Sequence, residues 1–202
     1  MAEWFARNEP LTPSEMSSNA QLVYGYCHGK GWSINAICGM LGNMTLESGI
    51  NPAAWQSYIV GSGGGGGFGL VQWTPWTNFT DWADAHGYEW EDGYAQLKWI
   101  DEETTNYGQW IPTTIWNFGW SAFKTSSLSP EDCASAFLKN FERAGVEKEQ
   151  DRRTSARSWY NYLSSVEPDI PDVPNPDTPT PPTGRKHRLS KLLLFSVATD
   201  LD

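Results

Sequence analysis

Glu47 and Gln72 are the residues whose types and spacing could perform acid catalysis on a polar substrate. Glu47 ends an apolar run within Met40–Pro52, and Gln72 follows a run of glycines within Gly67–Pro75. An acid that delivers a proton must stay protonated near neutral pH, and burial beside apolar side chains favours that form. The Gln72 amide offers two donors and an acceptor to a hydroxyl or acetamido group. Such a pair fits the cleavage of a glycosidic bond.

Both residues also have a structural interpretation. A glutamate at a helix end can pair with an arginine or cap a backbone amide, and many carboxyl groups with perturbed environments are structural. A glutamine at the end of a strand can be satisfied by the backbone alone. The spacing of Glu47 and Gln72 is therefore compatible with both the catalytic and the structural interpretation.

A second carboxyl group is harder to find. A glycosidase with two acids needs them about 5–10 Å apart, and no acid lies between residues 48 and 80. Asp81 and Asp84 lie on the helix expected next, and Glu142 ends a later one. Glu142 is the best candidate. The favoured interpretation of Glu142 is nevertheless structural, as the partner of one of three arginines, Arg143, Arg152 or Arg153.

Aromatic residues near these acids are candidates for sugar contacts. The chain has twelve tryptophans, and flat rings stack well on the apolar faces of sugars. We expect most of them to be packing residues. Trp55, Trp73 and Trp76 lie beside Glu47 or the glycine run, and we expect them to line a cleft.

The surrounding sequence predicts helices on both sides of the site. Thr12-Pro13-Ser14-Glu15 is a capping box that opens a helix ending near Gly29, and Ser33 opens the helix that carries Glu47. Residues 61–67 read as a mobile glycine loop, followed by a short strand at residues 68–73. Further helices are expected at residues 74–87, 94–100, 129–142 and 156–163, with no clear element at 104–128. The predicted class is α+β, mainly α, with a small β-hairpin beside the Glu47 helix.

The chain divides into four parts by composition. Residues 1–11 form an N-terminal extension, and residues 12–165 form the domain. Residues 166–184 are a linker rich in Pro, Asp and Thr. Residues 185–202 are basic and then apolar, and too short to span a bilayer. They could dock on a partner, add a strand to a partner's sheet or rest weakly on a membrane surface; docking is the favoured reading.

Composition also bears on partners and cofactors. A net charge of −10 argues against nucleic acid, which requires a basic surface. Cys27 and Cys38 fall among apolar residues and should be buried thiols, and the spacing of cysteines and histidines matches no metal signature. We therefore expect no metal and no cofactor. No signal peptide or membrane span is recognised, so we expect synthesis in a cytoplasm, release by another route and no stable membrane insertion.

Three motifs together resemble the phage tail lysozyme family. They are Met40–Pro52 (MLGNMTLESGINP), Gly67–Pro75 (GFGLVQWTP) and Phe137–Arg143 (FLKNFER), and the resemblance covers roughly residues 12–165. It implies a lysozyme-like fold and assigns the proton donor to Glu47. The GLVQW stretch also resembles the Gly-Leu-x-Gln strand of soluble lytic transglycosylases, where the glutamine side of the cleft helps to hold the glycan.

The resemblance implies an enzyme of the virion, at the tail tip, that opens peptidoglycan during genome entry. It would cleave glycan strands between N-acetylmuramic acid and N-acetylglucosamine, with the C-terminal segment contacting other tail proteins. Residues expected to contact the substrate are Gln72, Trp73, Phe68, Trp55 and Glu142.

Several alternatives stay open at this point. Cleavage could proceed by inverting attack of water, by participation of the substrate's acetamido group or by transglycosylation to an anhydro sugar. A tail module that binds glycan, or is structural, without turnover is the second hypothesis. A wall-remodelling enzyme of a conjugation apparatus is the third.

Overall fold

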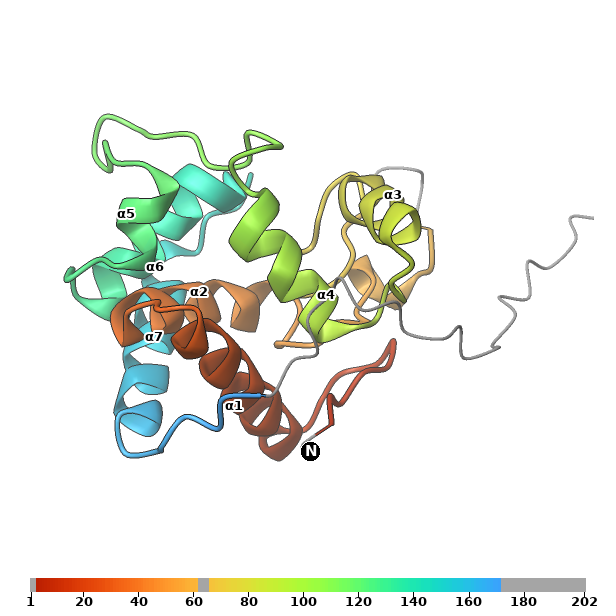
Figure 1. Cartoon of the computed structure of the whole chain (residues 1–202), viewed down its shortest axis with the longest axis horizontal. Coiled ribbons are helices and arrows are strands. Elements are labelled where there is room, and N and C mark those ends of the chain that lie inside the picture. Colours follow the sequence, from red (N-terminus) through yellow and green to blue (C-terminus); the bar gives the residue numbers. More distant parts are fainter. Residues whose placement is uncertain (1–2, 62–65, 172–202) are drawn as a thin grey trace, which may run out of the picture. The chain divides into compact units, whose positions relative to one another are not determined.

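Helix α2 (Ile34–Glu47) is the central element of the fold, and Glu47 is its last residue. The computed structural model describes residues 3–61 and 66–171. Ser33 caps the helix by accepting a hydrogen bond from the Ala36 amide at 3.2 Å, and this confirms the predicted start. Figure 1 shows α2 between α1 (Pro13–Gly29) and the helices α6 (Pro130–Phe137) and α7 (Glu149–Leu163).

Two glycines let α6 and α7 approach α2 closely. A Cβ atom added at Gly39 would lie 2.5 Å from the Cβ of Cys133 on α6, and one added at Gly42 would lie 2.5 Å from the Arg152 carbonyl on α7. Neither neighbour can move away without moving its helix. The three helices therefore pack tightly against one another, and this packing fixes the end of α2, where Glu47 lies.

Helix α1 begins as its sequence predicts. The Glu15 amide donates to the Thr12 hydroxyl at 3.3 Å, and the Thr12 amide donates to the Glu15 carboxylate at 2.8 Å. The preceding segment, predicted as an extension, lies against this helix. Asn19 accepts from the Phe5 amide at 2.9 Å and donates to the Phe5 carbonyl at 2.8 Å.

The predicted β-hairpin is wrong. In the part of the chain that the structure describes, the β-pairing within residues 54–73 is limited to isolated bridges, Trp55 with Phe68 and Phe68 with Trp73. Gly69 and Gln72 have φ angles of 77° and 50°, which interrupt an extended backbone. Phe68, Leu70 and Val71 are all buried, so the alternation of a half-exposed strand is also absent. These residues instead form a tight turn closed between Phe68 and Trp73.

The remaining elements are helical, which confirms the mainly α part of the prediction. A short turn, η1 (Gln56–Tyr58), precedes the glycine run, of which residues 62–65 lie outside the described residues. The helices that follow are α3 (Thr77–His86), α4 (Gly93–Lys98), η3 (Trp99–Glu103), α5 (Trp120–Lys124) and η4 (Leu138–Glu142). The short α5 lies in a region for which the sequence predicts no element.

The folded unit continues beyond the predicted boundary at residue 165. A Cβ at Gly25 would lie 2.0 Å from the Asp169 carbonyl oxygen, and one at Gly29 would lie 2.8 Å from the Ile170 side chain. The start of the predicted linker therefore packs on α1, and the first compact unit ends at Pro171. The rest of the linker and residues 185–202 lie outside the described residues. No helix within residues 3–61 and 66–171 has the length and apolar character needed to cross a bilayer.

Candidate active site

An open cleft of about 850 Å³ lies at the end of α2. Its lining comes from the end of α2, from segments within residues 54–74, from Asn78 on α3, from Gln109, and from residues 141–145 around the end of η4. Figure 1 shows α3 on one side of this position and α5, α6 and α7 on the other. The cleft therefore joins parts of the chain that are nearly a hundred residues apart in sequence.

Glu47 lies in this cleft as half of an ion pair. Its Oε1 is 2.6 Å from Nη2 of Arg152, and the two side chains are 18% and 4% exposed respectively. Its other oxygen, Oε2, has no hydrogen bond to a described residue. One carboxylate oxygen is thus held by α7, and the other is available to the cleft.

Arg152 is itself fixed by further hydrogen bonds. Its Nη1 donates to Oδ1 of Asn43 at 3.0 Å, and its Nε donates to the Glu147 carbonyl at 2.8 Å. Asn43 lies four residues before Glu47 on the same helix, so the two side chains share one face of α2. Glu47 therefore has the arginine partner that its structural interpretation predicts. The same glutamate also lines the cleft.

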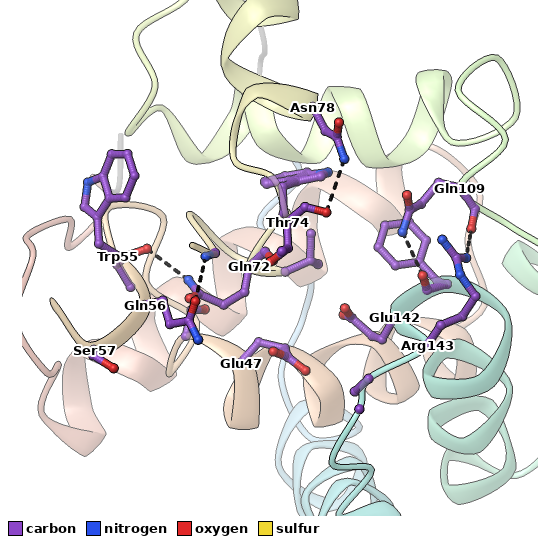
Figure 2. A pocket seen from close by; sticks show the side chains of 18 of the residues that line it. Glu47, Trp55, Gln56, Ser57, Gln72, Thr74, Asn78, Gln109, Glu142 and Arg143 are labelled. Carbon is purple, nitrogen blue, oxygen red and sulfur yellow. Dashed lines mark hydrogen bonds between the residues drawn. The ribbon is translucent and has the colours of Figure 1, made fainter. Parts of the chain in front are cut away.

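Glu142 also lines the cleft, and its environment differs from that of Glu47. The residue is partly exposed, but its Oε1 is buried and has no hydrogen-bond partner among the described residues. Burial raises the pKa of Glu142 well above the ordinary glutamate value, and the negative charge of Glu47 is the second cause of the rise. The positive charges of Arg152 and Arg143 lower this pKa, but by less. Figure 2 shows the carboxyl groups of Glu47 and Glu142 directed into the same part of the cleft.

The ion pair with an arginine that the sequence favours for Glu142 is wrong. Arg152 pairs with Glu47, and Arg153 lies 2.7 Å from Asp132. Arg143 instead donates through Nη1 to two backbone carbonyls, those of Gln109 and Asn140. All three arginines considered from the sequence are therefore engaged elsewhere.

Local backbone geometry explains how Glu142 reaches the cleft. Helix α6 widens into η4, a π-helical turn in which the Arg143 amide donates to the Leu138 carbonyl at 2.8 Å. Arg143 then takes a left-handed conformation with φ of 50°, which ends the helix. Such π-helical turns shift side chains from their regular helical positions and are frequent at functional sites.

Gln72 lines the cleft, but its amide protons are used within the turn. Its Nε2 donates to the carbonyls of Ala54 at 2.9 Å and Gly69 at 3.0 Å. Only Oε1 remains for a ligand. The sequence predicted both donors and the acceptor for substrate, so the structure reduces what this side chain can offer.

The predicted aromatic residues occupy different depths. Trp55 and Trp73 line the cleft, although each is almost fully buried. Phe68 is fully buried with its ring centroid 4.7 Å from that of Trp55, so it supports the cleft from beneath and is not placed to contact a substrate. Trp76 packs against Trp55 and Trp90 and does not line the cleft.

Several polar residues of the cleft are not predicted from the sequence. Gln56, Asn78 and Gln109 all line it, as Figure 2 shows. Gln56 follows Trp55 directly, and this proximity was a usable signal. Nothing in the local pattern around Asn78 or Gln109 indicates a site, because only the tertiary fold brings them to Glu47.

The other acids considered from the sequence do not reach the cleft. Asp81 and Asp84 lie on α3 and are not among the lining residues. Within the described ranges, no group of three or more His, Cys, Asp and Glu side chains is placed to hold a metal ion. The carboxyl chemistry of the cleft therefore involves Glu47 and Glu142.

The comparisons with known proteins agree with this arrangement. The sequence matches the phage tail lysozyme family over residues 18–163. It is also 40% identical over 161 residues to Morphogenesis protein 1 of Bacillus phage B103, covering 80% of this chain and 43% of that protein. The chain thus spans less than half the length of this relative. Because the family match covers most of the chain and includes the elements that carry Glu47, Gln72 and Glu142, the chain belongs to the phage tail lysozyme family.

Proposed function

We propose that this protein is a peptidoglycan glycosidase that cleaves the glycan backbone between N-acetylmuramic acid and N-acetylglucosamine, with Glu47 as general acid. The observation that carries the proposal is the position of Glu47 at the end of α2, in an open cleft that a second carboxyl group also lines. Cleavage of an acetal requires a carboxyl group that can protonate the leaving oxygen.

The shape and lining of the cleft support a glycan substrate. A volume of about 850 Å³ is large enough for a segment of a sugar chain. Amide side chains from Gln56, Asn78 and Gln109 offer donors and acceptors that suit hydroxyl and acetamido groups. Trp55 and Trp73 supply apolar surface beside them.

A role in the virion is part of the same proposal. The family consists of phage tail lysozymes, and the similar B103 protein is named for morphogenesis. An enzyme carried to the wall by a tail needs little electrostatic affinity of its own, which agrees with a net charge of −10. We propose that the protein acts at the tail tip, aids genome entry and contacts other tail proteins through residues 185–202.

The test is mass spectrometry of muropeptides released from purified Gram-positive sacculi. Wild type is compared with Glu47→Gln, which is nearly isosteric, and with Glu131→Gln as a matched control. Glu131 lies on α6, pairs with Arg157 at 2.6 Å and does not line the cleft. We expect release by wild type and Glu131→Gln, and a loss of roughly 10²-fold or more in Glu47→Gln with folding retained.

The products also decide between mechanisms. Reducing ends indicate hydrolysis, and anhydro ends indicate transglycosylation. Amidase or peptidase products, unchanged activity of Glu47→Gln, or its unfolding would contradict the assignment. Glycan binding without release by wild type would favour a binding module instead.

A further inference from the structure

We propose that Glu142 is the proton-holding partner of Glu47: the two carboxyl groups share one proton, which resides on Glu142 in the free protein. This inference rests on the proposed glycosidase function. Glu142 supplies the second carboxyl group, since no acid lies between residues 48 and 80.

The position of the Glu142 carboxyl group favours its neutral form. Its Oε1 is buried beside the cleft and has no hydrogen-bond partner among the described residues. In an ionised carboxylate, Oε1 would lose its hydration without compensation. The neutral acid avoids that penalty. Its O–H group can also donate to a water or a ligand in the cleft.

The positive charge around the two carboxyl groups is unevenly distributed. Arg152, from α7, is the only cation within 4 Å of either carboxyl group in residues 3–61 and 66–171, and it pairs with Glu47. Arg143 follows Glu142 directly, but its guanidinium is held by the backbone carbonyls of Gln109 and Asn140. Tyr58, the remaining titratable residue of the lining, is on η1 and exposed. One nearby cation balances one carboxylate, so the other carboxyl group is favoured in its neutral form.

The raised pKa of Glu142 agrees with a neutral carboxyl group at this position. Burial is the largest cause of the rise, and the charge of Glu47 is the second. Ionisation of Glu142 beside the charge of Glu47 is therefore unfavourable.

A shared proton gives a balanced cleavage cycle. In the cleavage step the proton passes from Glu142 to Glu47, and Glu47 donates it to the leaving oxygen as the glycosidic C1–O bond breaks. In hydrolysis, the oxygen of a water then bonds to C1 and its proton returns to the pair. In the anhydro outcome, the sugar's own 6-hydroxyl bonds to C1 and returns its proton in the same way. Either route restores the starting state.

Infrared difference spectroscopy at neutral pH tests where the proton resides, without using activity. The C=O stretch of a buried, protonated carboxyl group should appear in the difference between wild type and Glu142→Gln. It should be absent from the difference between wild type and Glu131→Gln, because Glu131 is ion-paired with Arg157. Absence of the band in wild type, or its persistence in Glu142→Gln, would overturn the inference.

The same band tests the coupling. In Glu47→Gln, the repulsion from Glu47 is removed and Arg152 loses its carboxylate partner, so Glu142 should lose its proton at a lower pH than in wild type. Identical titration of the band in the two proteins would exclude a shared proton.

The pH dependence of kcat/KM on sacculi completes the test. Glu142→Gln should lower activity at neutral pH by roughly 10²-fold, and its residual activity should move to more acidic pH. Glu142→Asp keeps a titrating carboxyl group and should retain the alkaline limb of the wild-type profile. If Glu142→Gln unfolds, Glu142→Asp alone is compared with wild type. A Glu142→Asp profile that lacks the alkaline limb then contradicts the inference. If the pH profile of Glu142→Gln superimposes on that of wild type while Glu47→Gln is inactive, only this inference is wrong. If Glu47→Gln is fully active, the glycosidase proposal itself is wrong.

Discussion

Nη2 of Arg152 on α7 lies 2.6 Å from Oε1 of Glu47 on α2, although the two residues are separated by 105 positions in the sequence. This contact fixes the last residue of α2 at the edge of the cleft. The same arginine donates to Asn43 and to the Glu147 carbonyl. Arg152 thus connects the proposed acid, the helix that carries it and the start of α7.

Replacing Arg152 should therefore destabilise the fold strongly. Arg152→Met keeps much of the volume but leaves Glu47, Asn43 and the Glu147 carbonyl without their donor. Because the arginine is only 4% exposed, we expect a loss of about 3 kcal/mol in the free energy of unfolding. Urea unfolding of Arg152→Met, Glu47→Gln and the double variant measures it. A double-mutant cycle should give a coupling of about 1–3 kcal/mol; additive effects would show that the pair contributes nothing to stability.

The raised pKa of Glu142 predicts a pH-dependent stability. The folded protein keeps a proton that the unfolded chain releases above the ordinary glutamate pKa of about 4.3. The stabilising contribution is therefore complete below that value and is lost as the pH rises toward and through the folded pKa. Glu142→Gln cannot release this proton, so it should match wild type near the acid end and be more stable at neutral pH. Thermal unfolding across this range measures the difference, with Glu131→Gln as control, and parallel curves for wild type and Glu142→Gln would contradict the prediction.

Local chemistry in the sequence predicts the two helices at the start of the domain well. The Thr12–Glu15 capping box and the Ser33 cap act within one helical turn, so neighbouring residues suffice to recognise them. Cys27 and Cys38 were expected to be buried from helical spacing, and both are buried free thiols. The same periodicity placed Glu47 at the edge of an apolar face.

The site itself depends on relationships that no local pattern contains. The partner of Glu47 comes from α7, and the orientation of Glu142 depends on the π-helical turn η4. The hairpin was predicted because the segment around Phe68, Leu70 and Val71 is rich in residues that favour strands. The prediction is wrong because the left-handed backbone at Gly69 and Gln72 makes a turn. Tertiary burial of the apolar side chains outweighed strand propensity there.

Gln72 should act mainly through the turn that it holds. Gln72→Ala removes two hydrogen bonds, to the carbonyls of Ala54 and Gly69, and should cost about 1–3 kcal/mol in the free energy of unfolding. Gln56→Ala is the matched control, since Gln56 is exposed and only accepts from the Gly67 amide; it should cost about 0.5–1 kcal/mol. Urea unfolding and glycan binding are measured on both. Unchanged stability with weakened binding in Gln72→Ala would assign Gln72 to direct substrate contact instead.

The close approach of α2 and α7 predicts a strong effect at Gly42. In Gly42→Ala, the new Cβ would lie 2.5 Å from the Arg152 carbonyl oxygen and 2.9 Å from Ala156, and both contacts are to the α7 packing surface. Alanine favours a helix over glycine by about 1 kcal/mol, but overpacking a dense interface costs about 1–3 kcal/mol, and backbone atoms cannot swing aside. We expect net destabilisation together with reduced cleavage, because displacing α7 also displaces Arg152 from Glu47. Gly119→Ala is the control, since nothing lies within 4 Å of its new Cβ, and it should stay within about 0.5 kcal/mol of wild type. If Gly42→Ala proved as stable as wild type, with full activity, the position of Glu47 would not depend on the seating of α7 against α2.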